Sequence, residues 1–506
     1  MNITLVMCSL LLGGLLAWYA EGIKKHSARW LALLTVLLLC FYFVISVTSA
    51  GLDFSELQIL IRLPWITSFN IEYTLALDYL SLVLVLLTLF LSVVCILISW
   101  QEIQNKTGFY YFNLLASIAG IIGVFTAMDM FLFFFFWEVM LLPMTALIAI
   151  WGHENKHFAA IKFFIFTQVS SLIMLVAIIA MATIHFQQTD QVSFFYQDWL
   201  VLELPSSVST YLMLGFFIAF AVKLPLVPVH SWLPDAHTQA PTAGSVLLAG
   251  VLLKTGAYGL IRFVLQLFPL ASMDFAPIAA TLGVVSILYG AKMAFAQQDF
   301  KRLVAYSSIS HMGFVILALF SLNAIAYQGV VLTLVAHGLS SAALFSLAGM
   351  IYSRIHTRNL SQMGGFWQSA PRMGGFALVF VAAAFGLPGL ANFVAEFLSL
   401  IGSYQRFPLL TILAAFGLIA STIYGMVLFQ SAFQGETQEN KQRKSVGKNK
   451  VQDFTKENLV TDLSKRELLV FSSLLALLII LGFYPNFVLM FFQIPELTLV
   501  FNTVGE

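Results

Sequence analysis

Charged residues are scarce in this sequence: Asp, Glu, Lys and Arg make up 10% of its 506 residues, against about 25% in an ordinary soluble domain. Hydrophobic residues make up 60%, and the mean hydropathy is +0.91. A water-soluble fold needs a charged surface to cover so much apolar material. The composition therefore excludes an ordinary soluble domain and predicts a chain whose solvent is mostly lipid.

Cysteine is also scarce, and Cys8, Cys40 and Cys95 each stand alone inside an apolar run. No C-x-x-C pair is present, and no two histidines are spaced as metal ligands on one helix face. A glycine-rich phosphate loop and a G-x-S-x-G nucleophile motif are missing as well. The sequence therefore shows no metal, redox or cofactor site. Its net charge of +1 gives no reason to expect a nucleic-acid partner.

What the sequence has in abundance is long apolar runs. The first, residues 3–20, follows no basic segment and precedes no A-x-A cleavage site, which indicates a spanning helix rather than an export signal. A helix crossing about 30 Å of hydrocarbon needs roughly 20 apolar residues. Segments that meet this requirement centre on 2–20, 30–49, 78–99, 109–126, 129–150, 159–184, 208–228, 240–268, 273–297, 302–320, 324–350, 373–402, 408–432 and 468–492.

These runs are too long and too apolar for the strands of a membrane barrel. Lipid also leaves each backbone polar group to be paired within its own segment, which only helices achieve here. We therefore predict an all-α, polytopic membrane protein of about 14 transmembrane helices. The longer connections 50–77 and 185–207 contain Trp, Tyr and Pro, and we expect them at the membrane interface.

The distribution of Lys and Arg predicts the orientation. Connections after odd-numbered helices carry 19 of these residues, eight of them in the polar stretch 433–467, whereas connections after even-numbered helices carry 3, namely Arg62, Arg262 and Arg406. Positive charge concentrates in cytoplasmic loops. The odd-numbered connections are therefore predicted to be cytoplasmic, and both termini are predicted to be periplasmic.

Six titratable residues interrupt the apolar runs. A charged side chain at the centre of a membrane helix costs about 2.5–3.5 kcal/mol on insertion scales, so such residues mark functional sites. The six lie on six different predicted helices: Glu138, Lys223, Lys254, His311, His337 and Glu396.

Each of these residues also has a structural interpretation. A lone histidine can hydrogen-bond at a helix interface, and a lysine near a helix end can extend its ammonium to the headgroups. Lys223 follows about 15 apolar residues and Lys254 lies in the middle of its run, so neither fits that interpretation well. Lys292 fits it better, because it lies seven residues before Asp299, which is roughly 10 Å of helix rise. We interpret Lys292 as a lysine that reaches the cytoplasmic headgroups.

Buried carboxylates and ammonium groups can carry protons. Burial moves the pKa of both types of group toward neutral pH, and a nearby opposite charge moves it back. A Glu–Lys pair is therefore a switch, since the lysine releases a proton only when the two groups are apart. Histidine titrates near neutral pH and can pass the proton on.

Proline and glycine interrupt two of the predicted helices. Pro225 and Pro228 follow Lys223, and the sequence Gly-Leu-Pro-Gly begins at Gly386, before Glu396. Broken helices at corresponding positions of two halves mark ion sites in inverted-repeat transporters. We expect two inverted five-helix repeats, helices 4–8 and 9–13, with helices 7 and 12 broken. The predicted organisation is 1–108 (helices 1–3), 109–268 (first repeat), 269–432 (second repeat), 433–467 (charged cytoplasmic connection) and 468–506 (helix 14 and tail).

These motifs resemble the antiporter-like subunits of respiratory complex I and of Mrp-type cation/proton antiporters. The resemblance rests on AVKLPLVPVHSWLPDAHTQAPTAGSVLLAGVLLKTGAYGLIRF (221–263), DFKRLVAYSSISHMGF (299–314) and the AHGLSSAALF run (336–345), and it extends over essentially the whole chain. Within the family, GLPGLANFVAEF, the FFFFFWE run and the loop 354–365 are similar to subunit M. The sister subunits L and N usually have lysine at the position of Glu396.

The resemblance implies a role for each buried charge. Glu138 and Lys223 would form the paired switch of the input half, and Lys254 would be the central carrier. His311 and His337 would continue the relay to Glu396, the terminal site towards the periplasm. Protons would enter from the cytoplasm past the loop with His230, Asp235 and His237, although shaping of the fold is the commoner role for such a loop. Lys292 and the long 433–467 connection depart from the family pattern.

The resemblance also implies partners and location. NADH, FMN, iron–sulfur clusters and quinone would bind to other subunits, so this chain alone would have no dehydrogenase activity. It would pack against the L- and N-type subunits in a bacterial inner membrane. Three alternatives stay open: an Mrp-type sodium/proton antiporter subunit, a partner of a membrane-bound hydrogenase, and a non-conducting scaffold in which the charges only hold helices together.

Overall fold

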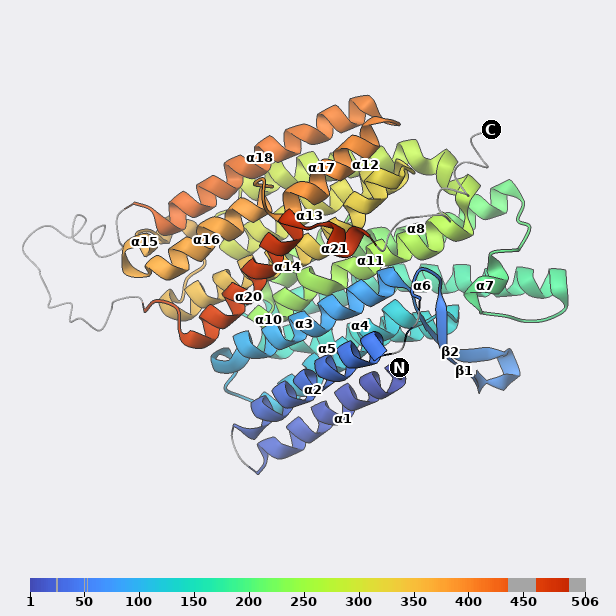
Figure 1. Cartoon of the computed structure of the whole chain (residues 1–506), viewed down its shortest axis with the longest axis horizontal. Helices are drawn as coiled ribbons and strands as arrows, with labels where there is room; N and C mark the ends of the chain where they lie inside the picture. The colour runs from blue at the N-terminus through green and yellow to red at the C-terminus, as the bar shows by residue number, and fades with distance from the viewer. Residues whose placement is uncertain (24–25, 50, 52, 436–460, 491–506) are drawn as a thin grey trace, which may run out of the picture.

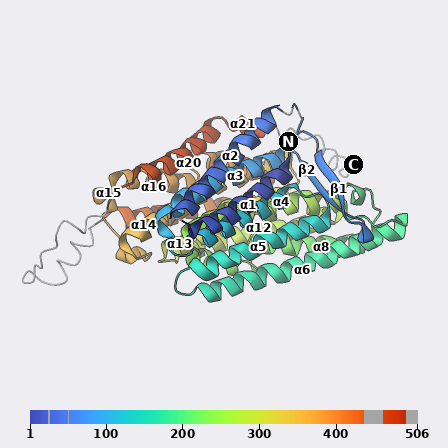
Figure 2. The same cartoon turned by 90° about the horizontal axis from the view of Figure 1, so that it is seen from below.

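The computed structural model describes residues 1–506 except 24–25, 50, 52, 436–460 and 491–506. It is a bundle of long helices that run roughly along one direction (Figures 1 and 2). In the described part of the chain, 13 spans are long and apolar enough to cross a membrane. They are α1 (Ile3–Glu21), α2 (Ser27–Ser49), α3 (Tyr79–Glu102), α4 (Thr107–Thr126), α5 (Met130–Trp151), α6 (Lys156–Thr189), α8 (Ser206–Lys223), Thr242–Leu265, α12 (Pro269–Phe295), α13 (Phe300–Phe320), α14 (Ala324–Ile355), α18 (Pro408–Phe433) and α20 (Lys465–Phe483).

Two shorter apolar helices, α16 (Pro371–Ala384) and α17 (Ala391–Tyr404), follow one another between α14 and α18. Together they correspond to the fourteenth predicted helix, at 373–402. The prediction of a polytopic all-α membrane protein is confirmed. The short elements between the spans are α7 (Tyr196–Trp199), α9 (Trp232–Gln239), α15 (Phe366–Ser369), α21 (Asn486–Leu489) and the single 3-10 turns Thr67–Phe69 and Leu360–Gln362.

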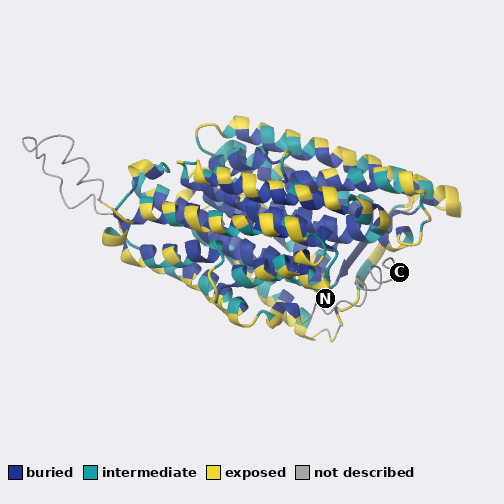
Figure 3. Ribbon diagram, turned by 90° about the horizontal axis from the view of Figure 1, so that it is seen from above, coloured by how far each residue is buried: buried dark blue, intermediate teal, exposed yellow. Residues whose placement is uncertain are grey.

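Three spans form the centre of the bundle. Thr242–Leu265, α13 and α14 are buried along the whole of their apolar windows, whereas only 22% of the α2 window is buried. Figure 3 shows this arrangement as a dark interior surrounded by helices with exposed outer faces. Five of the six predicted site residues lie on these three spans or on the helices that pack against them, α8 and α17. Charges on the central spans are therefore shielded from lipid by a ring of apolar helices.

The span Thr242–Leu265 contains two π-helical segments. It consists of α10 (Thr242–Leu247), the π segment Leu248–Leu252, α11 (Leu253–Gly259) and the π segment Leu260–Leu265. A π turn shifts the backbone hydrogen bonds and frees carbonyl groups for side chains, and such turns are frequent at functional sites. The sequence predicts a helix here but does not predict its π turns.

The break predicted in helix 7 is present. α8 ends at Lys223, and Leu224 precedes Pro225, which disfavours a helical conformation at Leu224. The chain then turns into the short helix α9. The side chain of Trp232 compensates for the lost helical bonds, because its indole nitrogen donates to the carbonyl oxygen of Val222 over 2.9 Å.

The break predicted in helix 12 is present as well. α16 ends at Ala384, and Gly386 and Gly389 adopt φ angles of +76° and +94°, which favour glycine. A Cβ atom on Gly386 would lie 3.0 Å from Oε2 of Glu396. The glycine therefore provides both the turn and the space for this carboxylate.

The connection at 50–77 is a β-hairpin, which the sequence analysis did not predict. Strands β1 (Gln58–Ile66) and β2 (Ile71–Leu77) pair antiparallel, with Arg62 opposite Thr74 in the register. The hairpin is attached to α5, because Asp129 at the N-cap of α5 accepts a hydrogen bond from the backbone nitrogen of Glu72 at 3.0 Å. Both views place the hairpin and the start of α1 at one end of the bundle and α15 at the other (Figures 1 and 2).

Several expected boundaries differ from the structure. Helix 14 was expected at 468–492, but α20 begins at Lys465 and ends at Phe483. A capping box at Ser464 starts this helix. Most of the expected connection 433–467 lies outside the described residues. Arg262 was assigned to an external connection, yet it is 6% exposed and forms an ion pair with Asp78.

Candidate functional site

The six predicted site residues fall into two groups in the structure. Glu138 and Lys223 lie on α5 and α8, whereas the other four lie on the central spans and α17. Lys223, Lys254, His311, His337 and Glu396 are each at most 4% exposed, and Glu138 is partly buried. All six side chains are therefore wholly or partly covered by the rest of the bundle.

Lys223 is the last residue of α8, and its ammonium group has no hydrogen-bond partner among the described residues. It lies over two aromatic rings, at 5.3 Å from the centroid of Trp137 and 5.5 Å from that of Phe163. Cation–π contact of this kind partly replaces the lost hydration of the charge. A buried ammonium held only by aromatic faces is poised to lose its proton or to find a new partner.

Glu138 follows Trp137 on α5, and one of its carboxylate oxygens accepts a 2.5 Å hydrogen bond from the hydroxyl of Ser171 on α6. No ion pair within 4.0 Å joins Glu138 to Lys223, and both residues are in the described part of the chain. The structure therefore shows this pair in its separated arrangement. Lys223 contacts Trp137, although it was expected to pair with Glu138, the next residue in the sequence.

Lys254 lies on α11, between the two π segments, and is completely buried. Its ammonium donates to the carbonyl oxygen of Ala249 over 2.5 Å and to Nδ1 of His337 over 2.8 Å. Ala249 belongs to the first π segment, so the π turn supplies an acceptor to the lysine of the next turn. The local backbone therefore positions the ammonium towards α14.

The contact between Lys254 and His337 is followed by two further titratable residues, His311 and Glu396. The rings of the two histidines, on α14 and α13, are 5.5 Å apart between centroids. Nδ1 of His311 lies 2.8 Å from Oε1 of Glu396 on α17. The second carboxylate oxygen of Glu396 and Nε2 of His311 have no hydrogen-bond partner among the described residues. Four titratable groups from four helices thus form one continuous row.

Glu396 also lines a cavity of about 220 Å³ at the end of this row. Gly386 from the break before α17 and apolar side chains of α17 and α18 form the rest of its wall, including Phe393, Phe397 and Ile419. Phe397 and Ile419 are half exposed on the outer surface of the bundle. The row therefore ends beside the lateral surface of the chain.

The row has the chemistry of a proton relay. While Lys254 is charged, its ammonium can only donate, so Nδ1 of His337 accepts and a neutral His337 then carries its proton on Nε2. His311 donates from Nδ1 to the carboxylate of Glu396 when that group is ionised. The separation of the two rings is one that a bridging water can span. A proton that leaves Lys254 can therefore reach Glu396 without passing through lipid.

The other charged positions singled out in the sequence lie outside this row. Lys292 is exposed on α12, as expected for a lysine that reaches the headgroups. Asp235 on α9 forms ion pairs with Lys162 at 2.7 Å and Arg302 at 3.4 Å. His237, also on α9, is completely buried and stacks on Phe345 with 4.5 Å between centroids.

His230 precedes α9 and is 7% exposed, and its ring contacts Tyr289 edge-on at 5.1 Å. In His237 both ring nitrogens lack a hydrogen-bond partner in the described part of the chain, as does Nδ1 of His230. The loop thus contains the two ion pairs of Asp235 and two buried imidazoles, of which His237 has no hydrogen-bond partner and His230 lacks one at Nδ1 among the described residues.

Three buried cations were missed by the sequence analysis. Lys301, Arg262 and Arg29 are 1%, 6% and 6% exposed, although all three were assigned to connections. Each lies within or near the end of a predicted helix. The count of Lys and Arg that predicted the orientation used only this position in the sequence. Their burial comes from helices distant in sequence, so only an analysis of the packing reveals it. No group of three or more His, Cys, Asp or Glu side chains that could hold a metal occurs among the described residues.

Comparisons with known proteins identify the family of this chain. Residues 127–423 match the family model for the membrane domain of NADH:quinone oxidoreductase and Mrp antiporters. The chain is 50% identical over 444 residues to subunit M of NADH-quinone oxidoreductase from Pseudomonas aeruginosa, covering 85% of this chain and 87% of the relative. It is 48% identical over 488 residues to the subunit of the same name from Escherichia coli, covering 94% and 93%.

The fold also matches a solved structure. A chain of respiratory complex I from Thermus thermophilus superposes on this one with a TM-score of 0.87 and 28% sequence identity, covering 100% of both chains. The match extends over the whole of this chain.

Proposed function

Because this chain belongs to the NADH:quinone oxidoreductase and Mrp antiporter family, within which its relatives are named subunit M, we propose that it conducts protons through the buried row of titratable residues. The chain is a multi-pass membrane subunit of an NADH-quinone oxidoreductase of the bacterial type. The relay passes protons between the centre of the bundle and Glu396.

The row from Lys254 to Glu396 carries this proposal. Its two outer contacts are 2.8 Å hydrogen bonds between titratable groups, and all four side chains are buried. Each buried ionisable group costs free energy in a membrane, so four in one row are not explained by packing alone. In this proposal Lys254 is the central carrier, and Glu396 is the terminal site towards the periplasm.

Glu138 and Lys223 form the input half in this proposal. The ammonium of Lys223 is free of hydrogen bonds in the described chain, and the carboxylate of Glu138 is held by Ser171. Movement of Glu138 towards Lys223 would hold the lysine in its charged form, and the observed separation favours release of its proton inward. The pair would thereby control when Lys254 receives a proton.

Several polar atoms of the row and of the input pair have no protein partner. The ammonium of Lys223, one oxygen of Glu396 and one nitrogen of His311 have no hydrogen-bond partner among the described residues. In this proposal, these atoms are where water or a proton in transit would bind.

Other subunits would carry out the redox chemistry, and this chain would assemble with them. We infer that NADH, FMN, the iron–sulfur clusters and quinone bind elsewhere in the complex, so this chain alone has no dehydrogenase activity. L- and N-type antiporter-like subunits would pack on its lateral faces. Both termini would be periplasmic, and the positively charged connections would face the cytoplasm.

NADH-driven proton pumping in inverted membrane vesicles tests the proposal. Glu138→Gln and Lys223→Ala are compared with the wild type, and assembly of the complex is checked on native gels. We expect both variants to assemble and to lose most of the pumping. Normal pumping by a correctly assembled variant would show that these charges are structural, and the proposed function would fail.

A further inference from the structure

Lys301 is a buried cation that the proposed relay does not use. It is the second residue of α13, and it is 1% exposed. Its ammonium donates a hydrogen bond of 2.9 Å to the carbonyl oxygen of Ala240, and no ion pair within 4.0 Å involves it in the described chain. His311 lies ten residues further along the same helix, a rise of about 15 Å. Lys301 thus lies on a relay helix, at the end of the bundle predicted to face the cytoplasm.

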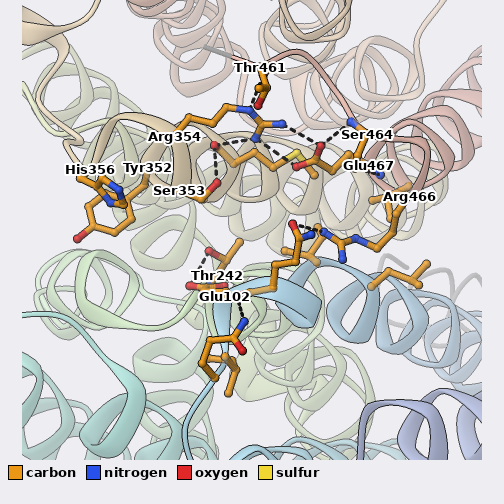
Figure 4. A pocket seen from close by; sticks show the side chains of 18 of the residues that line it. Glu102, Thr242, Tyr352, Ser353, Arg354, His356, Thr461, Ser464, Arg466 and Glu467 are labelled. Carbon is orange, nitrogen blue, oxygen red and sulfur yellow. Dashed lines mark hydrogen bonds and ion pairs between the residues drawn. The ribbon is translucent and has the colours of Figure 1, made fainter. Parts of the chain in front are cut away.

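A large cavity with several charged side chains lies next to Thr242, two residues after Ala240. Its volume is about 830 Å³, and its wall includes Glu102, His153, Thr242, Arg354 and Arg466. Figure 4 shows Glu102 and Thr242 together on one side of the cavity and the ion pair of Arg354 with Glu467 on the other. Because Glu102 ends α3 and is exposed into this space, its carboxylate can exchange protons with water.

Glu102 and Lys301 contact the same short stretch of backbone. The carboxylate of Glu102 accepts hydrogen bonds of 3.0 Å from both the backbone nitrogen and the hydroxyl of Thr242. Lys301 binds the carbonyl of Ala240, two residues earlier. His153, which also lines the cavity, donates its backbone N–H to Gln239 over 2.9 Å. Thr242, which lines the cavity, is therefore two residues along the chain from the carbonyl group that binds the ammonium of Lys301.

His237 is near enough to Lys301 and to the relay lysine Lys254 for the charges of both to act on it. It is on α9, three residues before Ala240. Its ring stacks on Phe345, which is eight residues, or about 12 Å of rise, from His337 on α14. Neither ring nitrogen has a hydrogen-bond partner among the described residues. Both nitrogens are therefore available for water or for a proton in transit.

We propose that Lys301 is the proton-uptake residue of this subunit, passing protons from the Glu102 cavity towards His237 and the Lys254 relay. The inference rests on the proposed function and adds an entrance to it. A lysine suits this position because its ammonium can lose and regain a proton, which a guanidinium does not. The charged groups around it are Glu102, Asp299, Arg358, His153 and His237.

The surroundings of Lys301 favour exchange over permanent charge. Asp299 is paired with Arg358 at 3.2 Å, and no ion pair within 4.0 Å joins it to Lys301 in the described chain. In the loop before α6, burial and then the charges of Lys301 and Arg358 lower the pKa of His153 to about 3, so this histidine stays neutral. Of the acidic residues that line the cavity, Glu467 is paired with Arg354 and Asp462 accepts backbone hydrogen bonds, whereas Glu102 contacts Thr242, close in the chain to the carbonyl that binds Lys301.

The competing role of Lys301 is structural, because its contact with Ala240 ends α9. Lys301→Arg separates the two roles, since arginine keeps the charge and can donate to the carbonyl but does not release a proton. Lys301→Met removes both functions. Lys156 provides the matched control, because its ammonium also donates to a helix-end carbonyl, that of Ile150 at 2.7 Å, without facing the relay.

The experiment uses the intact complex in inverted vesicles, where the cytoplasmic face meets the buffer. We expect Lys301→Arg to assemble and to lower the initial pumping rate at least about tenfold, the order of a lost proton-transfer group. Lys301→Met should behave in the same way, and Lys156→Arg should pump normally. Recovery of pumping in Lys301→Arg relative to Lys301→Met would assign Lys301 to the structural role and overturn the proposal.

Two further variants make every outcome decisive. If neither Lys301 variant assembles, Glu102→Gln decides between the two roles. The amide can still accept from Thr242 but carries no exchangeable acid. Slowed pumping by this variant supports the proposal, and normal pumping overturns it. Lys254→Met is measured in the same series. Normal pumping by Lys254→Met would overturn the relay itself, whereas loss there with normal pumping in Lys301→Arg would overturn only the entrance.

Discussion

The ammonium nitrogen of Lys254 lies 2.8 Å from Nδ1 of His337, and the two residues are 83 positions apart in the sequence. This contact joins two of the central spans at a point where both are fully buried. Because the lysine donates, the proton of His337 is on the nitrogen that faces away from it. The polarity of the hydrogen bonds therefore runs from Lys254 towards His311 and Glu396.

The first prediction concerns the central carrier. Lys254→Arg keeps a positive charge and a donor for Ala249 and His337, but its guanidinium stays protonated. We expect the assembled complex to lose at least about tenfold in pumping rate, close to the loss in Lys254→Met. The measurement is NADH-driven acidification of inverted vesicles. Pumping by Lys254→Arg near the wild-type rate would show that only the charge of Lys254 matters.

The second prediction concerns the helix break beside Glu396. Gly386→Ala forces an L-residue into a φ of +76°, which costs roughly 1–2 kcal/mol, and its Cβ would lie 3.0 Å from Oε2 of Glu396. We expect a lower thermal unfolding midpoint for this subunit and slower pumping.

Gly375→Ala is the matched control for this prediction. Gly375 lies inside α16, where an added Cβ meets nothing within 4 Å, and alanine favours the helix by about 1 kcal/mol. We expect it to leave both the unfolding midpoint and the pumping rate unchanged or slightly higher. Equal effects of the two variants would contradict the role assigned to the turn at Gly386.

The third prediction concerns Asp129, between α4 and α5. Burial raises the pKa of this carboxyl to about 6, against backbone hydrogen bonds from Glu72, Leu132 and Phe131 that lower it. The folded state therefore keeps a proton that the unfolded state has released, in the window from its ordinary pKa of 3.8 up to about 6. In that window the stability contributed by Asp129 falls as the pH rises, by about 2–3 kcal/mol in total.

Asp129→Asn removes this titration while it keeps a side-chain oxygen for the N-cap of α5. We expect the difference in unfolding midpoint between the asparagine variant and the wild type to grow in favour of the variant from about pH 4 to about pH 6. Above that window the difference should be constant. Parallel curves across the whole range would show that Asp129 titrates normally.

Much of this fold follows from local sequence. Each apolar run long enough to cross lipid becomes a helix, because no other backbone arrangement satisfies its polar groups there. The breaks after Lys223 and around Gly386 follow from proline and glycine in the same segments. The β-hairpin at 58–77 could not be recognised in the same way, because its attachment to Asp129 depends on a residue more than 50 positions away.

The residues of the candidate site likewise divide into those that the sequence identifies and those that it does not. Glu138, Lys223, Lys254, His311, His337 and Glu396 could be identified from sequence, because each interrupts an apolar run of its own helix. Lys301 could not, because it lies at a helix end and is buried only by helices packed around it.

The sequence by itself determined that this chain is a membrane protein. It also determined the positions at which the helices break and the residues that are too costly to bury in a membrane without a function. The tertiary structure alone decided which of those residues meet. It placed His337 against Lys254 and His311 against Glu396, it placed Lys223 over aromatic rings, and it placed Lys301 against the carbonyl group of Ala240. The reason is physical: the cost of burying a charge is a property of one segment, whereas its hydrogen-bond partner comes from another helix and is fixed only when the bundle packs.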